Sequence, residues 1–438
     1  MSQRSDFDAV VVGSGAGGLC AAARLAQAGL RPLVVERRSR LGGRASTEDI
    51  DGHKVNVGAI AIELGGVFEE TFALVGAPLV LREPKPASAF YLDGKVVDVS
   101  RGGWAFLLGQ VTRHAAKVLG AFAEARAGSL PDGRLSTKDW LEGFTRNETA
   151  HALFRNLCAA IFACNADELP ARAFLTYFTQ KGAFKRFGFC PDGTIGVWRA
   201  LAGAITRLGG EIWLDAPAQR ILVRDGRAAG VVVARGGETV TIGADTVVSN
   251  IGPKATVALA GRDAFPPGYL EAADALRSAA NIVFNFASRQ RLFDAPGLIT
   301  FGKTQRLCNM AELTAMCPEL APAGWHQYVA YAVPVPALGD FDADAEIALA
   351  RQDFEAQFPA LDLDGPDTKM LSVRVMCGDW PAQRACAGYD LPQTTGIAGL
   401  WCVGDGVKDY GNGGTQACAE TARRAVEEIV SECRRRAG

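Results

Sequence analysis

The chain has 438 residues, of which 48% are hydrophobic and 21% are charged, and its formal net charge is −2. This length suffices for two domains of ordinary size, and the hydrophobic content suffices for a sizeable core. The near-neutral charge argues against a nucleic-acid partner, because such proteins carry a marked basic excess. A membrane-spanning helix needs roughly 18 or more consecutive apolar residues, and no such run occurs.

The cysteines and the N-terminus bear on location. The 11 cysteines contain neither a CxxC pair nor the spacing of a metal site, so we expect mostly buried free thiols and no metal. Residues 1–6 lack the apolar core of a signal peptide. Both features favour a cytoplasmic protein. Peripheral contact with a membrane surface remains an open alternative.

A glycine-rich turn follows the first predicted strand. Residues 9–12 form an apolar strand, and a helix of small residues is predicted over 19–28. In the turn between them, Gly13 permits the tight bend and Gly15 lets a pyrophosphate approach the backbone, while Gly18 lets helix and strand pack closely. Because a helix N-terminus presents free N–H groups and a positive dipole end, the turn predicts a dinucleotide site.

An acidic residue stands where a dinucleotide-binding fold needs one. A second apolar strand over 32–35 ends on Glu36, which lies 18 residues beyond Gly18. There a carboxylate can accept both ribose hydroxyls of an adenosine, and it disfavours a 2′-phosphate. The cofactor predicted at this point is therefore FAD or NAD rather than NADP. The strand, helix and acid in their expected places argue against a plain glycine loop.

The next motif separates FAD from NAD. Leu41-Gly42-Gly43-Arg44 follows the ribose-binding position directly. From here the chain resembles the flavoprotein amine oxidase and phytoene desaturase superfamily, whose first segment continues into a Gly-Gly-Arg motif beside the FAD pyrophosphate. The resemblance implies non-covalent FAD, with Arg44 near the phosphates or the flavin. A solvent-exposed loop is the plain alternative.

The stretch over 51–66 matches this superfamily in part. The related enzymes usually carry Asp before the glycine that matches Gly58, where this chain has Asn56-Val57. The resemblance still places Gly58 and Ala59 near the cofactor. His53 is one of only four histidines, and a hydrogen-bonded structural role is the better interpretation than a catalytic one.

Residues 68–190 predict a helical block with one hairpin, at 90–97. Helices are predicted over 104–126 and 137–166 from the spacing of apolar residues. The stretch 153–164 is apolar almost all round, so it is either a buried helix or the wall of an apolar cavity. These two interpretations are equally weighted.

Aromatic and basic residues alternate over Phe178–Phe189, with Lys181, Lys185 and Arg186 among phenylalanines. Such a pattern suits a membrane interface or an access channel for an apolar substrate. An ordinary helix end with a solvated basic face explains it equally simply, and we favour that interpretation.

From residue 191 the pattern returns to short strands joined by tight turns, which continue to about 250. The succession resembles the second FAD segment of the phytoene desaturase relatives. There backbone groups at the start of the first hairpin strand contact adenine. The usual Val is Ala218 here, and Asn250 ends the returning strand near the nucleotide. Further strands are predicted over 281–287 and 327–335, and a helix over 342–358.

The C-terminal segment carries the second strong motif. A strand ends in Gly404-Asp405, and a glycine-rich stretch then opens a helix to about residue 433. By resemblance, Asp405 bonds a ribityl hydroxyl, and Gly414 to Gln416 face the flavin N1/C2 edge, where a helix N-terminus stabilises negative charge. The intervening residues 407–410 depart from a typical carotenoid desaturase, which leaves the substrate open.

The predicted fold is a two-domain α/β flavoprotein. A Rossmann-like FAD-binding domain of glutathione reductase type comes from residues 1–67, 191–254 and 391–438, and a mixed sheet and helical substrate domain from 68–190 and 255–390. The residues expected to contact the cofactor lie in the turns and strand ends of the first domain: Gly13, Gly15, Ala16, Gly17, Gly18, Glu36, Arg37, Gly42, Gly43, Arg44, Gly58, Ala59, Ala218, Asn250, Gly404, Asp405, Gly414, Thr415 and Gln416.

Three functions follow from the resemblance. The first is an FAD-dependent desaturase or saturase that acts on carbon–carbon bonds of an apolar, isoprenoid-like molecule by hydride transfer at flavin N5, with a quinone or O2 as electron acceptor. The second is a flavin amine oxidase, for which Tyr410, Trp380 and Lys303 are weak catalytic candidates. The third is a prenyl-binding carrier of the same fold without flavin, against which Glu36 and Asp405 argue.

Overall fold

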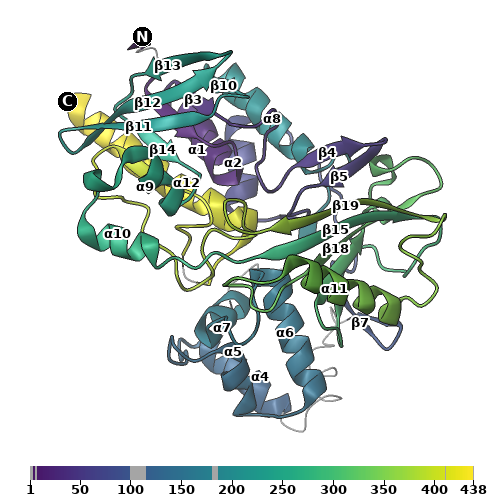
Figure 1. Ribbon diagram of the computed structural model, residues 1–438. Coiled ribbons are helices and arrows are strands. Elements are labelled where there is room, and N and C mark those ends of the chain that lie inside the picture. Colours follow the sequence, from purple (N-terminus) through teal and green to yellow (C-terminus); the bar gives the residue numbers. More distant parts are fainter. Residues whose placement is uncertain (1–2, 5–6, 99–114, 180–185, 410, 438) are drawn as a thin grey trace.

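The computed structural model describes residues 3–4, 7–98, 115–179, 186–409 and 411–437 (Figure 1). A five-stranded parallel sheet lies at the centre of the FAD-binding domain. Its strands run in the order β10 (Glu211–Trp213), β3 (Pro32–Val35), β2 (Ala9–Val12), β14 (Val247–Ser249) and β20 (Leu400–Cys402). Each neighbouring pair is parallel. The strands come from three separated stretches of the chain.

Two layers cover this sheet. Helices lie on one face: α1 (Ala16–Gln27), α2 (Val67–Val75), α8 (Thr194–Arg207) and α12 (Gly414–Ala437). An antiparallel meander of β11 (Ala218–Arg224), β12 (Arg227–Arg235) and β13 (Glu238–Ile242) packs on the other face, with β1 (Gln3–Arg4) parallel at its edge. Because both faces are covered, β2 and β3 are buried throughout, and their sequences read as continuous apolar runs.

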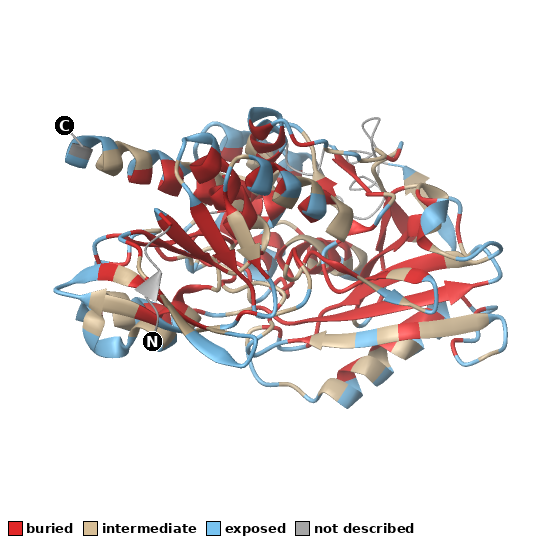
Figure 2. Ribbon diagram, turned by 90° about the horizontal axis from the view of Figure 1, so that it is seen from above, coloured by how far each residue is buried: buried red, intermediate tan, exposed pale blue. Residues whose placement is uncertain are grey.

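The predicted substrate domain contains a seven-stranded mixed sheet. Its order is β19 (Thr368–Met376), β15 (Asn281–Ser288), β18 (His326–Ala332), β17 (Leu307–Glu312), β16 (Leu298–Phe301), β7 (Ser88–Leu92) and β8 (Lys95–Asp98). Neighbours are antiparallel except β16 and β7. The hairpin predicted over 90–97 is β7 and β8. Figure 2 shows buried residues gathered along both sheets and the helices against them.

Helices cover both faces of the seven-stranded sheet. One face packs against a helical layer of α4 (Ala115–Arg126), α5 (Thr137–Glu142), α6 (Glu148–Phe162) and α7 (Ala171–Thr179). The other face packs against α11 (Ala343–Gln357), close to the predicted 342–358. Asp342 caps α11 by accepting from the N–H groups of Asp344 and Ala345.

Short elements complete the fold. They are the hairpin β4 (Thr47–Ile50) and β5 (His53–Asn56), the pair β6 (Ile62–Glu63) and β9 (Phe187–Gly188), helices α9 (Pro253–Ala260) and α10 (Pro267–Asp274), and 3-10 turns at Arg262–Ala264, Leu313–Ala315 and Pro318–Leu320.

The helix predicted over 137–166 is wrong as a single element. The chain leaves the helix after α5, at Gly143, and starts α6 anew, where the Asn147 side chain accepts from the Ala150 N–H at 3.0 Å. A side-chain cap of this kind competes well with helix continuation. Of the helix predicted over 104–126, the structure describes the part from residue 115; the rest lies outside the described residues.

The basic and aromatic stretch is described only in part, because 180–185 lie outside the described residues. Phe187 and Phe189 are buried in the core, and Arg186 forms an exposed ion pair with Glu83 at 2.9 Å. These contacts fit the plain interpretation of a solvated basic face better than a membrane interface. No helix within the described ranges is long and apolar enough to cross a bilayer.

Candidate functional site

The turn from β2 into α1 has the geometry that its glycines predicted. Gly13 has a φ of +95°, a conformation that side chains rarely adopt. A Cβ atom at position 18 would lie 2.0 Å from the carbonyl oxygen of Gly13, so only glycine allows this close packing of helix on strand. Ala16 is the first residue of α1, and Gly15 is its N-cap. The free N–H groups of α1 therefore open at the carboxyl edge of the parallel sheet.

Asn250 joins the three segments at this edge. It follows β14, and its backbone N–H donates to the Val12 oxygen at 2.9 Å. A Cβ atom added to Gly15, Gly17 or Gly404 would lie 2.6 Å, 2.7 Å or 2.6 Å, respectively, from the Asn250 side-chain amide. Larger residues at these three glycines would collide with the amide. The predicted residues from all three segments thus meet around one side chain.

Glu36 lies at the end of β3 beside the turn and is buried. Its Oε2 accepts from both the backbone N–H and the hydroxyl of Ser14 at 2.8 Å, and its Oε1 accepts from the Arg38 N–H at 3.0 Å. The carboxylate is therefore held in a fixed orientation at the predicted ribose position. Arg37 and Arg38 face the Trp380 ring, with their guanidinium carbons 5.8 Å and 4.1 Å from its centroid.

Arg44 forms a two-pronged ion pair with Asp405. Its Nη2 lies 2.5 Å from Oδ1 and its Nη1 lies 2.9 Å from Oδ2. Nη1 also donates to the carbonyls of Pro381 and Ala382, at 3.1 Å and 2.7 Å. Burial raises the pKa of Asp405, but the Arg44 charge and its hydrogen bonds outweigh burial and hold that pKa well below its usual range. The motif that resembled a phosphate contact is here tied to a carboxylate, and the role of Asp405 toward a ribityl hydroxyl stays a prediction.

The N-terminus of α12 carries a residue that sequence reasoning missed. Glu63 Oε2 accepts from the Gln416 N–H at 3.0 Å and from the Thr415 hydroxyl at 3.3 Å. A Cβ atom at Gly414 would collide with this carboxylate. Burial raises the pKa of Glu63, opposed by the hydrogen bonds from Gln416 and Thr415. That this helix end faces the flavin stays a prediction. The sequence signal was an acid two residues before the glycine pair at 65–66.

The remaining predicted contacts lie around the same edge. The Ala59 N–H donates to the Arg44 carbonyl at 3.2 Å, and the Gly58 carbonyl accepts from the Tyr331 hydroxyl at 2.7 Å. A Cβ atom at Gly43 would be 3.4 Å from the Gly15 Cα, and one at Gly42 would meet the Trp198 ring. Ala218 begins β11 in the meander layer.

Of the three weak catalytic candidates, the structure describes Lys303 and Trp380, and these two lie apart. Tyr410 lies outside the described residues. Lys303 is exposed, and its carbonyl accepts from Gln357 of α11 at 3.1 Å, which places it with α11 and away from Trp380. Trp380 lies near the predicted cofactor residues, through Arg37 and Arg38. All 11 cysteines are free, and most are buried, as expected. The described residues hold no cluster that could bind a metal.

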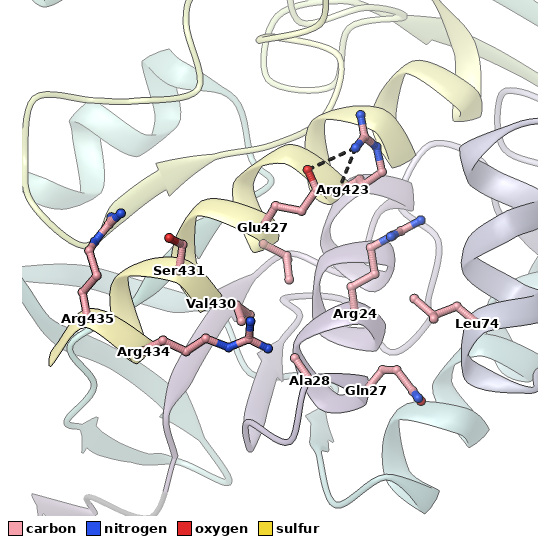
Figure 3. Close-up of a pocket in the computed structure, with 11 residues that line it drawn as sticks. Arg24, Gln27, Ala28, Leu74, Arg423, Glu427, Val430, Ser431, Arg434 and Arg435 are labelled. Carbon is pink, nitrogen blue, oxygen red and sulfur yellow. Dashed lines mark hydrogen bonds and ion pairs between the residues drawn. The ribbon is translucent and has the colours of Figure 1, made fainter. Parts of the chain in front are cut away.

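A surface cavity of about 590 Å³ lies elsewhere, between α1, α2 and α12 (Figure 3). Its lining is mixed basic and apolar and consists of Arg24, Gln27, Ala28, Leu74, Arg423, Val426, Glu427, Val430, Ser431, Arg434 and Arg435. It adjoins the C-terminal end of α1, whereas the glycine turn is at the N-terminal end. A helix rises roughly 1.5 Å per residue, so this cavity is not part of the nucleotide site.

Glu36→Ala should lower FAD affinity strongly, because it removes the acceptor for two ribose hydroxyls. Each such charge-assisted bond contributes roughly 1.5–3 kcal/mol. The measurement is the ratio of FAD to protein after purification. Glu238→Ala, at the exposed start of β13, is the matched control. A Glu36→Ala protein that purifies with a full complement of FAD would contradict the assignment.

Asp405→Asn should destabilise the deflavinated protein by about 3 kcal/mol near pH 7, because it leaves a largely buried guanidinium without its carboxylate. The pKa of Asp405 is depressed on folding, so this stabilisation is present above the unfolded pKa of about 3.9 and is lost as pH falls further. Urea unfolding from pH 7 to 3 measures it. As a control, Asp274→Asn removes the carboxylate of the exposed ion pair with Arg262, and it should lower the free energy of unfolding by less than about 1 kcal/mol. The difference in the free energy of unfolding between wild type and Asp405→Asn should shrink below pH 4. A difference that stays constant there would contradict the assignment of this stabilisation to the ionised Asp405.

Comparison with known proteins is consistent with this site. Residues 16–430 match the family described as flavin containing amine oxidoreductase. The lycopene-forming phytoene desaturase of Paracoccus sp. is 28% identical over 391 residues, covering 77% of this chain and 76% of that protein. Over several other curated relatives the match is partial, and the chain spans 11% to 57% of their length.

Solved structures share the whole fold. An oxidoreductase from Methanosarcina mazei has a TM-score of 0.83 at 25% identity, covering 96% of this chain and 99% of that one. A putrescine oxidase bound to putrescine has a TM-score of 0.67 at 16% identity, covering 98% and 99%. The predicted α/β flavoprotein fold, the FAD cofactor and, at the level of the family, the oxidoreductase class are confirmed. The chain belongs to the family of flavin containing amine oxidoreductases.

Proposed function

We propose that the protein oxidises or reduces carbon–carbon bonds of an apolar, isoprenoid-like small molecule, with a quinone or O2 as electron acceptor. The observation that carries this proposal is the apolar character of the helical layer beside the cofactor residues. Helices α6 and α7 contribute many buried apolar side chains to one cluster with a face of the seven-stranded sheet. The similarity to a phytoene desaturase supports the same substrate class.

Contacts link this helical layer to the predicted flavin edge. A Cβ atom at Gly411, three residues before α12, would lie 2.6 Å from Thr176 of α7. The side-chain amide of Gln383, in the segment held by Arg44, donates to the Ile161 carbonyl of α6 at 3.4 Å. The Tyr331 hydroxyl, on the sheet face that packs against these helices, reaches Gly58. An apolar substrate held by α6 and α7 would therefore lie next to the cofactor residues, where ligand sites between domains are common.

Each described histidine has a hydrogen-bond partner within the chain, which supports a structural role over a catalytic one. His53 is buried, and its Nδ1 lies 3.1 Å from Gln327 Oε1. His151 Nε2 contacts the Thr145 carbonyl at 2.8 Å, and His326 Nδ1 contacts Glu312 at 2.9 Å. His114 lies outside the described residues. FAD supplies the hydride chemistry when bound, and the chain's residues then bind and orient the substrate and exclude water.

Anaerobic titration with a panel of isoprenoids and amines tests the proposed substrate class. The absorbance of the oxidised flavin should bleach with an unsaturated or partly saturated isoprenoid and stay unchanged with primary and secondary amines. Reduced enzyme should give up its electrons to a quinone or O2. Bleaching by amines alone would make the protein an amine oxidase, the alternative class that the putrescine oxidase fold also hosts.

Single substitutions of His53, His114, His151 and His326 should each leave the rate of flavin reduction by substrate within about tenfold of wild type. A general acid or base contributes roughly 10²–10⁴-fold, and no histidine is expected in that role. Stopped-flow reduction of the FAD-loaded variants measures the rate. A thousandfold loss in any one variant that retains FAD would move catalysis onto that histidine.

A further inference from the structure

The segment over 377–386, here called the strap, crosses from the substrate domain to the carboxyl edge of the parallel sheet. It follows β19, and the Ala382 N–H donates to the Ala279 carbonyl at 2.9 Å. Arg44 holds it through two strap carbonyls, and the Arg384 N–H donates to Asp405 Oδ2 at 2.7 Å. The strap backbone is therefore fixed by the same ion pair that joins the first and last segments of the FAD-binding domain.

The stem of the Arg384 side chain lies against two glycines at that edge. If Gly252 carried a Cβ atom, that atom would lie 2.6 Å from the Arg384 Cδ and 3.4 Å from its Nε. A Cβ atom on Gly406 would lie 3.4 Å from the Arg384 Cβ. Gly252 follows β14 by three residues, and Gly406 follows β20 by four. A side chain at position 252 would displace the arginine. The stem thus lies where β14 and β20 end, against a glycine that is two residues from Asn250.

The Arg384 guanidinium makes no ion pair with any described residue. Both carboxylate oxygens of Asp405 accept from Arg44, and Oδ2 also accepts from the Arg384 backbone. In the described part of the chain, no carboxylate lies within ion-pair distance of the Arg384 guanidinium. Burial and the positive charges of Arg44 and Arg37, opposed in part by the negative charges of Asp405 and Asp379, lower the pKa of Arg384 to about 10. A guanidinium that stays charged at neutral pH in this place favours an anion beside it.

We infer that Arg384 binds the pyrophosphate of FAD. Arginine suits phosphate because its planar fork donates two parallel hydrogen bonds to an anion. The glycine turn that receives a pyrophosphate lies at the same edge, since Asn250 packs against Gly15 and Gly17. Arg44, the arginine that the sequence motif favoured, has its donors directed to Asp405 and the strap carbonyls. Arg44 thus positions the strap, and Arg384 supplies the charge.

The inference depends on FAD as cofactor and not on the proposed substrate, so binding measurements test it apart from turnover. The full-length chain stripped of FAD is titrated calorimetrically with FAD, ADP and adenosine. Arg384→Gln should raise the Kd for FAD and for ADP by about tenfold to a hundredfold, the range for a hydrogen bond to a charged group. It should leave the Kd for adenosine within about twofold, because adenosine has no phosphate.

Two further variants make the result decisive. Arg262→Gln removes an exposed arginine paired with Asp274 and should bind all three ligands as wild type does. Arg384→Lys keeps the positive charge without the planar guanidinium and should bind ADP more tightly than Arg384→Gln does. If Arg384→Gln does not fold, Arg384→Lys serves as the test, because it should weaken ADP binding relative to adenosine binding. Equal weakening of ADP and adenosine, or unchanged FAD affinity in Arg384→Gln, would overturn the inference.

Discussion

The ion pair between Arg44 and Asp405 is the interaction on which the arrangement of this protein depends. It joins a residue from the first stretch of the chain to one from the last, and its remaining donor capacity fixes the strap that comes out of the substrate domain. Three parts of the chain that are far apart in sequence therefore share one buried polar network. Such networks specify a unique arrangement when every member is satisfied, and here both carboxylate oxygens and both terminal guanidinium nitrogens have partners.

The parallel sheet determines where this network and the nucleotide residues can meet. Strands that run in one direction bring their carboxyl ends to one edge, where ligands of open α/β sheets bind. Glu36, Asn250 and Gly404 all follow such strand ends. The glycines between them let backbones and the Asn250 amide approach to distances that a Cβ atom would forbid. These residues therefore lie close together because the strands run in one direction and because a few positions carry no side chain.

The parts of this site that could be predicted from the sequence are those with a short local sequence pattern. The glycine turn, Glu36 and the opening of α12 each lie within one strand–turn–helix unit, so spacing along the chain reports spacing in the fold. Arg384 was missed because no periodic pattern or motif surrounds it. Glu63 was missed because its partners Thr415 and Gln416 lie 352 and 353 residues away along the chain. Arg44 was found, but its partner Asp405 was not inferred for the same reason. The break at Gly143–Asn147 was missed because the apolar spacing of α5 continues into that of α6.

The strand order has a consequence for how the chain folds during synthesis. β14, in the centre of the parallel sheet, pairs with β2 on one side and with β20 on the other, so this sheet cannot be completed until residue 402 has left the ribosome. Most strands of the seven-stranded sheet pair within residues 281–376 and are made earlier. Closing the long loops between β2, β14 and β20 costs chain entropy, and such distant contacts slow folding. Four of the five strands of the parallel sheet are nevertheless made by residue 249, before the strands over 281–376. The edge of β14 is therefore the surface that needs protection until the last strand arrives.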